Sequence, residues 1–109
     1  MEFESVNNQE GTERRKQRRL PFIEDILLDN IFFCTSVDIS ESGIFVSGIL
    51  HFDENDVVEI AIPLREEQIR VKGQVKNCQP GVGAGLEFID LNDEQIAKIR
   101  KLIESIAKP

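Results

Sequence analysis

The 109-residue sequence predicts a mainly β domain, an antiparallel sandwich or barrel followed by one C-terminal amphipathic helix. Short apolar segments recur at a spacing of roughly ten residues between positions 20 and 89, and turn residues rather than helical patterns separate them. Residues 69–76 alternate between apolar and polar side chains, as a strand with one solvated face does. Residues 92–106 instead have apolar side chains at helical spacing.

The first strands are expected in the stretch that follows Leu20. Residues 26–28 and 31–35 are rich in branched and aromatic side chains, which favour strands, and two polar residues interrupt them. Residues 43–47, with the sequence GIFVS, have the same composition and predict another strand.

The middle of the chain predicts two further strands. A polar turn at residues 53–56 precedes a strand at residues 57–62, which Pro63 ends because proline has no N–H to donate to a ladder. In the alternating segment 69–76 only Gly73 breaks the pattern, since it stands at an apolar position. This glycine therefore indicates a bulge or close packing.

The last strand is expected at residues 82–89, after a turn at residues 79–81, and it is expected to form a hairpin with the strand before it. The segment 81–85 is rich in glycine, but it lacks the strand–loop–helix setting of a phosphate-binding loop. A turn with a bulge explains these glycines better.

A helix is expected at residues 92–106. Asn92 is a favourable N-cap, and Gln95 stands three residues later, as in a capping box. The polar face has charges of both signs and the apolar face has no aromatic residue, so we expect the helix to pack on the β domain rather than on a membrane. The apolar face comprises Ile96, Ile99, Leu102, Ile103 and Ile106.

The folded domain is expected at residues 12–107, and residues 1–11 are expected to form a disordered tail because they offer few apolar side chains. No apolar stretch approaches the ~18 residues that a membrane span needs, and the N-terminus lacks a signal-peptide pattern. We therefore expect a cytoplasmic protein without membrane insertion, in which Cys34 and Cys78 are reduced.

A dense basic cluster stands out in a protein whose net charge is −7. Five of the six residues at positions 14–19, RRKQRR, are cationic. Arginine offers a planar fork of donors that matches phosphate oxygens or the Hoogsteen edge of guanine, so an arginine-rich cluster favours a nucleotide ligand. The acidic remainder of the chain argues against a polynucleotide, because phosphates along a strand would be repelled by the whole protein.

A second motif lies at residues 38–43, with the sequence DISESG. In an extended segment Asp38 and Ser40 would lie on one face, and Ile39 would point into the core. A carboxylate accepts readily from the N1–H and amino group of guanine, and Gly43 allows a tight turn. Taken alone, an Asx or serine turn between two strands would also explain the motif.

No set of residues indicates catalysis or a metal site. No nucleophile stands next to a histidine base, and no phosphate-binding loop is present. His51 is the only histidine and has no cysteine pair or second histidine nearby. We therefore expect a binding protein and not an enzyme.

The two motifs together resemble the PilZ domain family. The pattern Arg15-x-x-x-Arg19 is followed about twenty residues later by Asp38-x-Ser40-x-x-Gly43, which runs into an apolar strand. Leu20-Pro21-Phe22 after the second arginine, the segment Gly85–Ile89 and the closing helix are also similar to the family. The resemblance covers residues 12–107.

The resemblance implies a six-stranded antiparallel barrel of the split-barrel type that binds the bacterial second messenger cyclic di-GMP. It implies that Arg15 and Arg19 hold the phosphates and guanine Hoogsteen edges. It also implies that Asp38 and Ser40 contact the amino edge of a guanine and that Gly43 shapes the turn.

Three further residues are accessory candidates: Arg14 and Arg18, beside the two motif arginines, and Lys76, as a phosphate contact. Many relatives have a bulky aromatic residue late in the strand that here reads Gln74–Asn77, and this chain has none. An arginine directly before the motif favours a bound pair of messenger molecules over a single one.

The resemblance also suggests how a signal would be passed on. Binding would order the arginine-rich segment over the barrel and change a surface that a downstream protein partner contacts. One alternative is an adaptor that has the fold but does not use the ligand, and another is a nucleic-acid binder that uses the basic segment.

Overall fold

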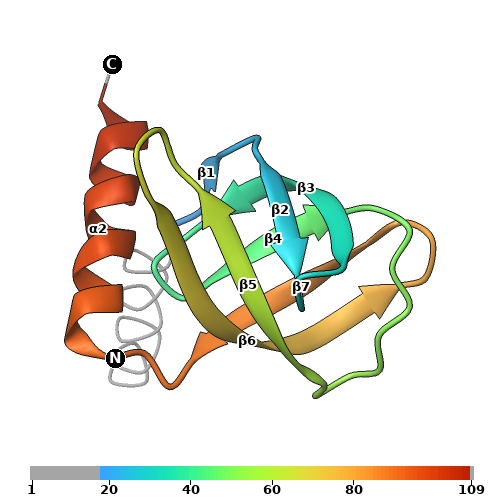
Figure 1. The fold of residues 1–109 in the computed structure, drawn as a ribbon. Coiled ribbons are helices and arrows are strands. Elements are labelled where there is room, and N and C mark those ends of the chain that lie inside the picture. The colour runs from blue at the N-terminus through green and yellow to red at the C-terminus, as the bar shows by residue number, and fades with distance from the viewer. Residues whose placement is uncertain (1–17, 109) are drawn as a thin grey trace, which may run out of the picture.

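The computed structural model describes residues 18–108, which form seven strands and one helix (Figure 1). In chain order they are β1 Leu20–Pro21, β2 Asp25–Leu28, β3 Phe32–Ile39, β4 Gly43–Ser47, β5 Val57–Pro63, β6 Gln68–Gln79, β7 Gly83–Ile89 and α2 Asp93–Ala107. The disordered tail predicted at residues 1–11 lies outside this range, as do Arg14 and Arg15.

The strands form a closed antiparallel barrel. Their order is β1-β3-β2-β5-β6-β7-β4, and a further pairing of β3 with β4 closes the circle of six strands from β2 to β7. The short strand β1 pairs with the end of β3 beyond β2. The predicted six-stranded barrel with a C-terminal helix is therefore confirmed, and the sandwich alternative is excluded.

Several strand ends differ from the predicted ones. Ile31 belongs to the turn after β2, where its N–H donates to the carbonyl of Leu28 over 3.0 Å, and β3 then continues to Ile39 instead of ending at residue 35. Strand β6 extends past the alternating segment to Gln79. Strand β1 has no signal in the residue pattern, because two residues carry no detectable periodicity, and only the family resemblance pointed to Leu20-Pro21-Phe22 as the entry into a first strand.

The barrel interior is filled by branched aliphatic side chains from every wall strand. Fully buried examples are Ile26, Leu28, Ile39, Ile44, Val46, Ile60, Ile62, Ile69 and Val75. Removing one such side chain from water stabilises the fold by about 1.5–3 kcal/mol. Gly73 packs against one of these side chains. A Cβ at residue 73 would be 2.4 Å from Cδ1 of Ile60, so close packing, and not a bulge, accounts for this glycine.

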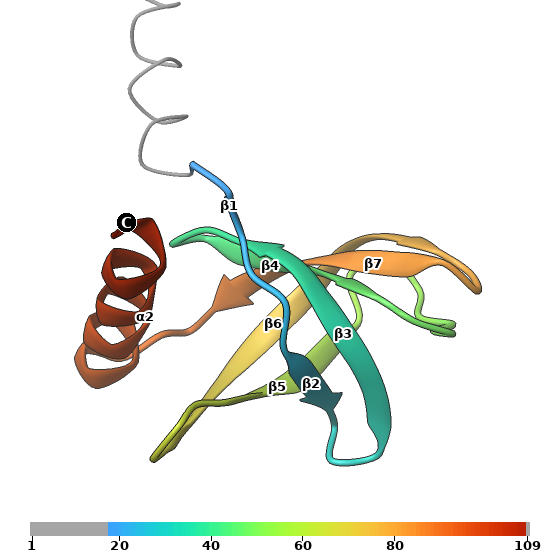
Figure 2. The same cartoon turned by 90° about the horizontal axis from the view of Figure 1, so that it is seen from above.

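Helix α2 lies against one side of the barrel (Figures 1 and 2) and contacts β6 and β1. The predicted capping box is present: the Asn92 side chain accepts from the N–H of Gln95 over 2.7 Å, and the Gln95 side chain accepts from the N–H of Asn92 over 2.8 Å. Ile99 is fully buried against the barrel, and three apolar side chains of the same face pack partly beside it, Leu102, Ile103 and Ile106.

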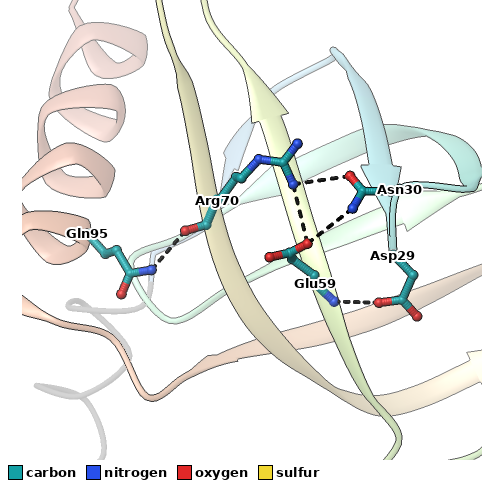
Figure 3. Close-up of polar contacts among 5 residues, drawn as sticks. All are labelled: Asp29, Asn30, Glu59, Arg70 and Gln95. Atoms are coloured by element: carbon teal, nitrogen blue, oxygen red, sulfur yellow. Dashed lines mark hydrogen bonds and ion pairs between the residues drawn. The ribbon is translucent and has the colours of Figure 1, made fainter.

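A polar network fixes the wall formed by β2, β5 and β6 (Figure 3). Asp29 and Asn30 have φ values of 53° and 61°, as a tight hairpin turn requires. The Asp29 carboxylate accepts from the N–H of Glu59 over 2.8 Å, and Arg70 donates to the side chains of Asn30 and Glu59 over 3.1 and 3.3 Å. Gln95 donates to the Arg70 carbonyl over 2.8 Å and so connects the helix to this wall.

Candidate ligand-binding site

A cleft of about 310 Å³ lies on the outer wall of the barrel, across β3, β4, β7 and β6. Its lining residues are Arg19, Asp38, Ser42, Gly43, Phe45, Lys76, Asn77, Gly85, Leu86 and Glu87. The strand registers arrange four of them in one row, because Asp38 pairs with Phe45, Phe45 with Gly85, and Gly85 with Asn77. Three strand spacings of about 4.8 Å make this row about 14 Å long.

Two β-bulges turn the ends of this row toward solvent. On β3 the register shifts between Ser36 and Asp38, so that Val37 and Asp38 both lie outside the barrel, while Ser36 and Ile39 are buried. A strict alternation after Ser36 would place the Asp38 carboxylate in the core. The bulge therefore makes this aspartate available to a ligand.

The second bulge lies on β6, opposite β7. Its register shifts between Val75 and Asn77, and the side chains of Lys76 and Asn77 both lie outside the barrel. The Lys76 Nζ lies 3.3 Å from the Glu87 Oε1 across the cleft. The structure thus brings the accessory candidate Lys76 into the same cleft as Asp38.

Arg19 and Asp38 form an ion pair at the opposite end of the cleft. The Arg19 Nε donates to the Asp38 Oδ1 over 2.6 Å, because pairing of β1 with β3 places residue 20 opposite residue 39. Both side chains are partly exposed, so this pair adds at most about 1 kcal/mol to stability. A ligand can therefore replace it at little cost. Arg18 is exposed and does not line the cleft.

Ser40 lies beneath the cleft, not in it. Its side chain is fully buried, and its Oγ accepts from the N–H of Ser42 over 3.2 Å. The N–H of Ser40 donates to the carbonyl of Gly43 over 2.8 Å. Ser40 thus shapes the turn between β3 and β4, whereas Ser42, which the sequence analysis did not single out, lines the cleft.

Gly43 is required by the contact between β4 and β7. A Cβ at this position would lie 2.3 Å from the carbonyl oxygen of Leu86, where no side chain fits. Without a side chain at this point, the strands approach closely and the floor of the cleft stays open.

The described lining of the cleft is electrically balanced. Two cations, Arg19 and Lys76, face two carboxylates, Asp38 and Glu87, and each cation is paired with one of them. These residues alone offer no net attraction to an anion. An anionic ligand would need further positive charge from elsewhere in the chain.

Besides Ser42, five lining residues were not predicted from the sequence, namely Phe45, Asn77, Gly85, Leu86 and Glu87. No short motif marks them, because their proximity depends on the pairing of β4, β7 and β6 and on the bulge in β6. The glycine-rich segment 81–85 was noted in the sequence, but it was interpreted as a turn with a bulge and not as part of a site. Only Gly81 has a positive φ, of 78°, whereas Gly83 and Gly85 belong to β7 itself.

The described residues show no other reactive centre. Within residues 18–108, no group of three or more His, Cys, Asp or Glu side chains could hold a metal ion. Burial raises the pKa of the Cys34 thiol to about 11, so the thiolate needed for nucleophilic attack is scarce at neutral pH. No helix in the same range is long and apolar enough to cross a membrane.

The barrel and the helix define a small β-barrel domain, and sequence comparison identifies its family. A family model of the PilZ domain matches residues 13–105, so the chain belongs to the PilZ domain family. PilZ domains are a family of cyclic di-GMP receptors, and they act as binding or adaptor domains rather than as enzymes. No curated protein matches the chain significantly.

Two solved structures share the fold. The PilZ domain of CeSA from a cellulose-synthesizing bacterium is 20% identical, with a TM-score of 0.66 over 84% of this chain and 99% of that one. The Bacillus subtilis inhibitor of motility, MotI/DgrA, is 20% identical, with a TM-score of 0.70 over 84% of this chain and 50% of that one. This chain therefore spans half the length of MotI.

Proposed function

We propose that this PilZ domain is a receptor that binds cyclic di-GMP in the cleft across β3, β4, β7 and β6. The observation that carries this proposal is the meeting of Arg19, Asp38 and Gly43 in one cleft. The three residues come from both predicted motifs, and nineteen positions separate the arginine from the aspartate that it contacts.

The chemistry of the Arg19–Asp38 pair suits a guanine nucleotide. When a ligand separates the pair, the Asp38 carboxylate accepts from the N1–H and amino group of a guanine, and the Arg19 guanidinium donates to a phosphate or to O6 and N7. Both groups then exchange an exposed ion pair for charge-assisted hydrogen bonds in a less hydrated setting.

The balanced charge of the cleft supports a role for the rest of the arginine-rich segment. Cyclic di-GMP has two phosphate charges, and the described lining has no net charge to offer them. Arg14 and Arg15, with Arg18 beside them, supply the missing positive charge when the segment closes over the ligand. Closure also changes the outer surface of the barrel, to which a downstream protein partner binds.

Isothermal titration of cyclic di-GMP tests the proposal. Arg15→Ala, Arg19→Ala and Asp38→Ala should each lose about 2–5 kcal/mol of binding free energy, which is about 30-fold or more in Kd. Arg65→Ala is the matched control, because Arg65 is exposed in the turn between β5 and β6 and does not line the cleft. Absence of binding to the folded wild-type protein would refute the proposal.

A ligand-independent adaptor is the second candidate, and exposed apolar side chains favour it. Phe33 on β3 and Ile49 after β4 are each 80% exposed, and Ile31 is 66% exposed. Side chains of this kind commonly mark contact surfaces. An adaptor would bind its protein partner with the same affinity in the presence and absence of cyclic di-GMP, and Asp38→Ala would leave that affinity unchanged.

A further inference from the structure

From Asp38 the cleft continues across β4, β7 and β6, where it has a floor and two walls. Phe45 of β4 forms one wall and Asn77 of β6 the other, and Gly85 of β7 lies between them in the same cross-strand row. None of these three residues belongs to either motif of the sequence.

The ring of Phe45 rests on Gly83 of β7. Its Cε2 lies 3.3 Å from the point where a Cβ of Gly83 would stand, so a side chain at Gly83 would displace the ring. The ring is only partly buried and lines the cleft. Part of its surface is therefore left for a flat ligand group to stack on.

Gly83 and Gly85 differ in whether the packing of the strands requires a glycine. A Cβ on Gly83 would be 2.4 Å from the carbonyl oxygen of Val46, so the packing of β7 against β4 requires glycine there. For a Cβ on Gly85 the nearest atoms belong to the Asn77 side chain, at 3.2 Å or more, and not to the backbone. The fold therefore does not demand glycine at residue 85, and the effect of its missing side chain is to keep the floor of the cleft bare.

Asn77 supplies polar groups beside this floor. The bulge in β6 places its side chain outside the barrel, next to Gly85. Within residues 18–108 the amide makes no hydrogen bond to another side chain or to the backbone, so both its donor and its acceptor are available. An amide at the edge of an aromatic surface matches the edge of a nucleobase.

We propose that Phe45, Gly85 and Asn77 form a subsite for a purine base of the bound dinucleotide. The base stacks on the Phe45 ring above the bare floor at Gly85, and the Asn77 amide hydrogen-bonds to its edge. This inference rests on the proposed function. Phe45 is the cross-strand neighbour of Asp38, and Asn77 stands at the far end of a row about 14 Å long, so this subsite begins beside the guanine contact at Asp38 and extends away from it. Phe45 thereby provides the aromatic surface that residues 74–77 lack.

Titration of cyclic di-GMP into three variants tests the subsite. Stacking of a base on an aromatic side chain is strong enough that Phe45→Leu should raise Kd about tenfold or more. Gly85→Ala should weaken binding by placing a methyl group on the floor, and Asn77→Ala by removing the amide. Phe33→Leu is the matched control, because Phe33 is 80% exposed and does not line the cleft.

Fluorescence supplies a second readout that does not depend on loss of binding. The chain has no tryptophan and no tyrosine, so Phe45→Trp introduces a single fluorophore. This variant should keep binding, and its emission should be quenched by the stacked purine in proportion to ligand bound. The Phe33→Trp variant should show no quenching at the same saturation.

The outcomes separate this inference from the proposed function. Failure of the wild-type protein to bind cyclic di-GMP would overturn both. Binding by the wild type, together with a Kd of Phe45→Leu within about twofold or an unchanged emission of Phe45→Trp at saturation, would overturn the subsite alone. Weakened binding by Phe45→Leu, with quenching only at residue 45, would establish it.

Discussion

Replacing Gly43 by alanine is expected to destabilise the barrel itself, whether or not ligand is present. The added methyl group would lie 2.3 Å from the carbonyl oxygen of Leu86 and 3.3 Å from the Cα of Glu87. Both atoms belong to the backbone of β7, so no side-chain rotation can relieve the contact. Strands β4 and β7 must move apart where Gly43 pairs with Glu87.

The size of the effect follows from the cost of overpacking. Forcing one extra carbon into a well-packed site costs about 1–3 kcal/mol, which lowers the Tm of a domain of this size by roughly 5–20 °C. Thermal and urea unfolding of the Gly43→Ala protein without ligand measure both quantities. Cyclic di-GMP binding by this variant should also weaken, because Ser42 directly precedes Gly43 and Asp38 of β3 pairs with Phe45 of the same strand β4.

Gly85→Ala is the matched control for this experiment. The atoms nearest to its added methyl group belong to the end of the Asn77 side chain, which can move aside. We expect its unfolding free energy to stay within about 0.5 kcal/mol of the wild type. Equal stabilities of the Gly43→Ala and wild-type proteins would refute the packing explanation, and the motif glycine would then act through the ligand alone.

Three further predictions concern the scaffold. Ser40→Ala should lower the free energy of unfolding by about 1–3 kcal/mol in urea denaturation, because the N–H of Ser42 loses its acceptor beneath the cleft. Ile99→Ala should cost about 2–5 kcal/mol in the same assay, since it leaves a cavity between α2 and the barrel. In the native protein at pH 8 a thiol reagent should modify Cys78 before Cys34, as followed by mass spectrometry. Burial covers the Cys34 thiol and raises its pKa to about 11, so its thiolate becomes abundant only as the pH approaches that value. Faster modification of Cys34 would contradict this reasoning.

The overall fold could be predicted because its signals are local. The alternation in residues 69–76 marks β6, and the Asn92–Gln95 capping box marks the start of α2 within one residue. Turn residues between the apolar segments then leave little choice but an antiparallel arrangement. The closed barrel itself followed from the family resemblance, since local pattern alone did not separate a barrel from a sandwich.

The candidate site could be predicted only where a motif marks it. Arg19, Asp38 and Gly43 meet in the cleft as the family pattern implies. Ser40 shows the limit of that pattern, because alternation placed it beside Asp38, whereas the strand ends at Ile39 and the serine is buried. Phe45 enters the cleft through strand pairings across more than thirty residues, which no local signal reports.

The position of the cleft follows from the way two bulges and two glycines are combined. A regular barrel wall presents one outward side chain for every two residues, which gives an even surface. Here the bulge in β3 presents Val37 and Asp38 together, and the bulge in β6 presents Lys76 and Asn77 together. Between these raised edges, β4 has Gly43 and Phe45 on its outer face, and β7 has Gly83 and Gly85.

This arrangement makes a concave surface without any insertion in the barrel. The extra side chains raise the two edges, and the missing side chains at Gly43 and Gly85 lower the surface beside the Phe45 ring, so that a flat ligand can lie across four strands. Strand packing requires glycine at residue 43 but not at residue 85. Gly43→Ala therefore tests the stability of the fold, whereas Gly85→Ala tests ligand binding. If Gly85 has no role in ligand binding, Gly85→Ala will bind cyclic di-GMP with the affinity of the wild type. That result would contradict the proposed subsite.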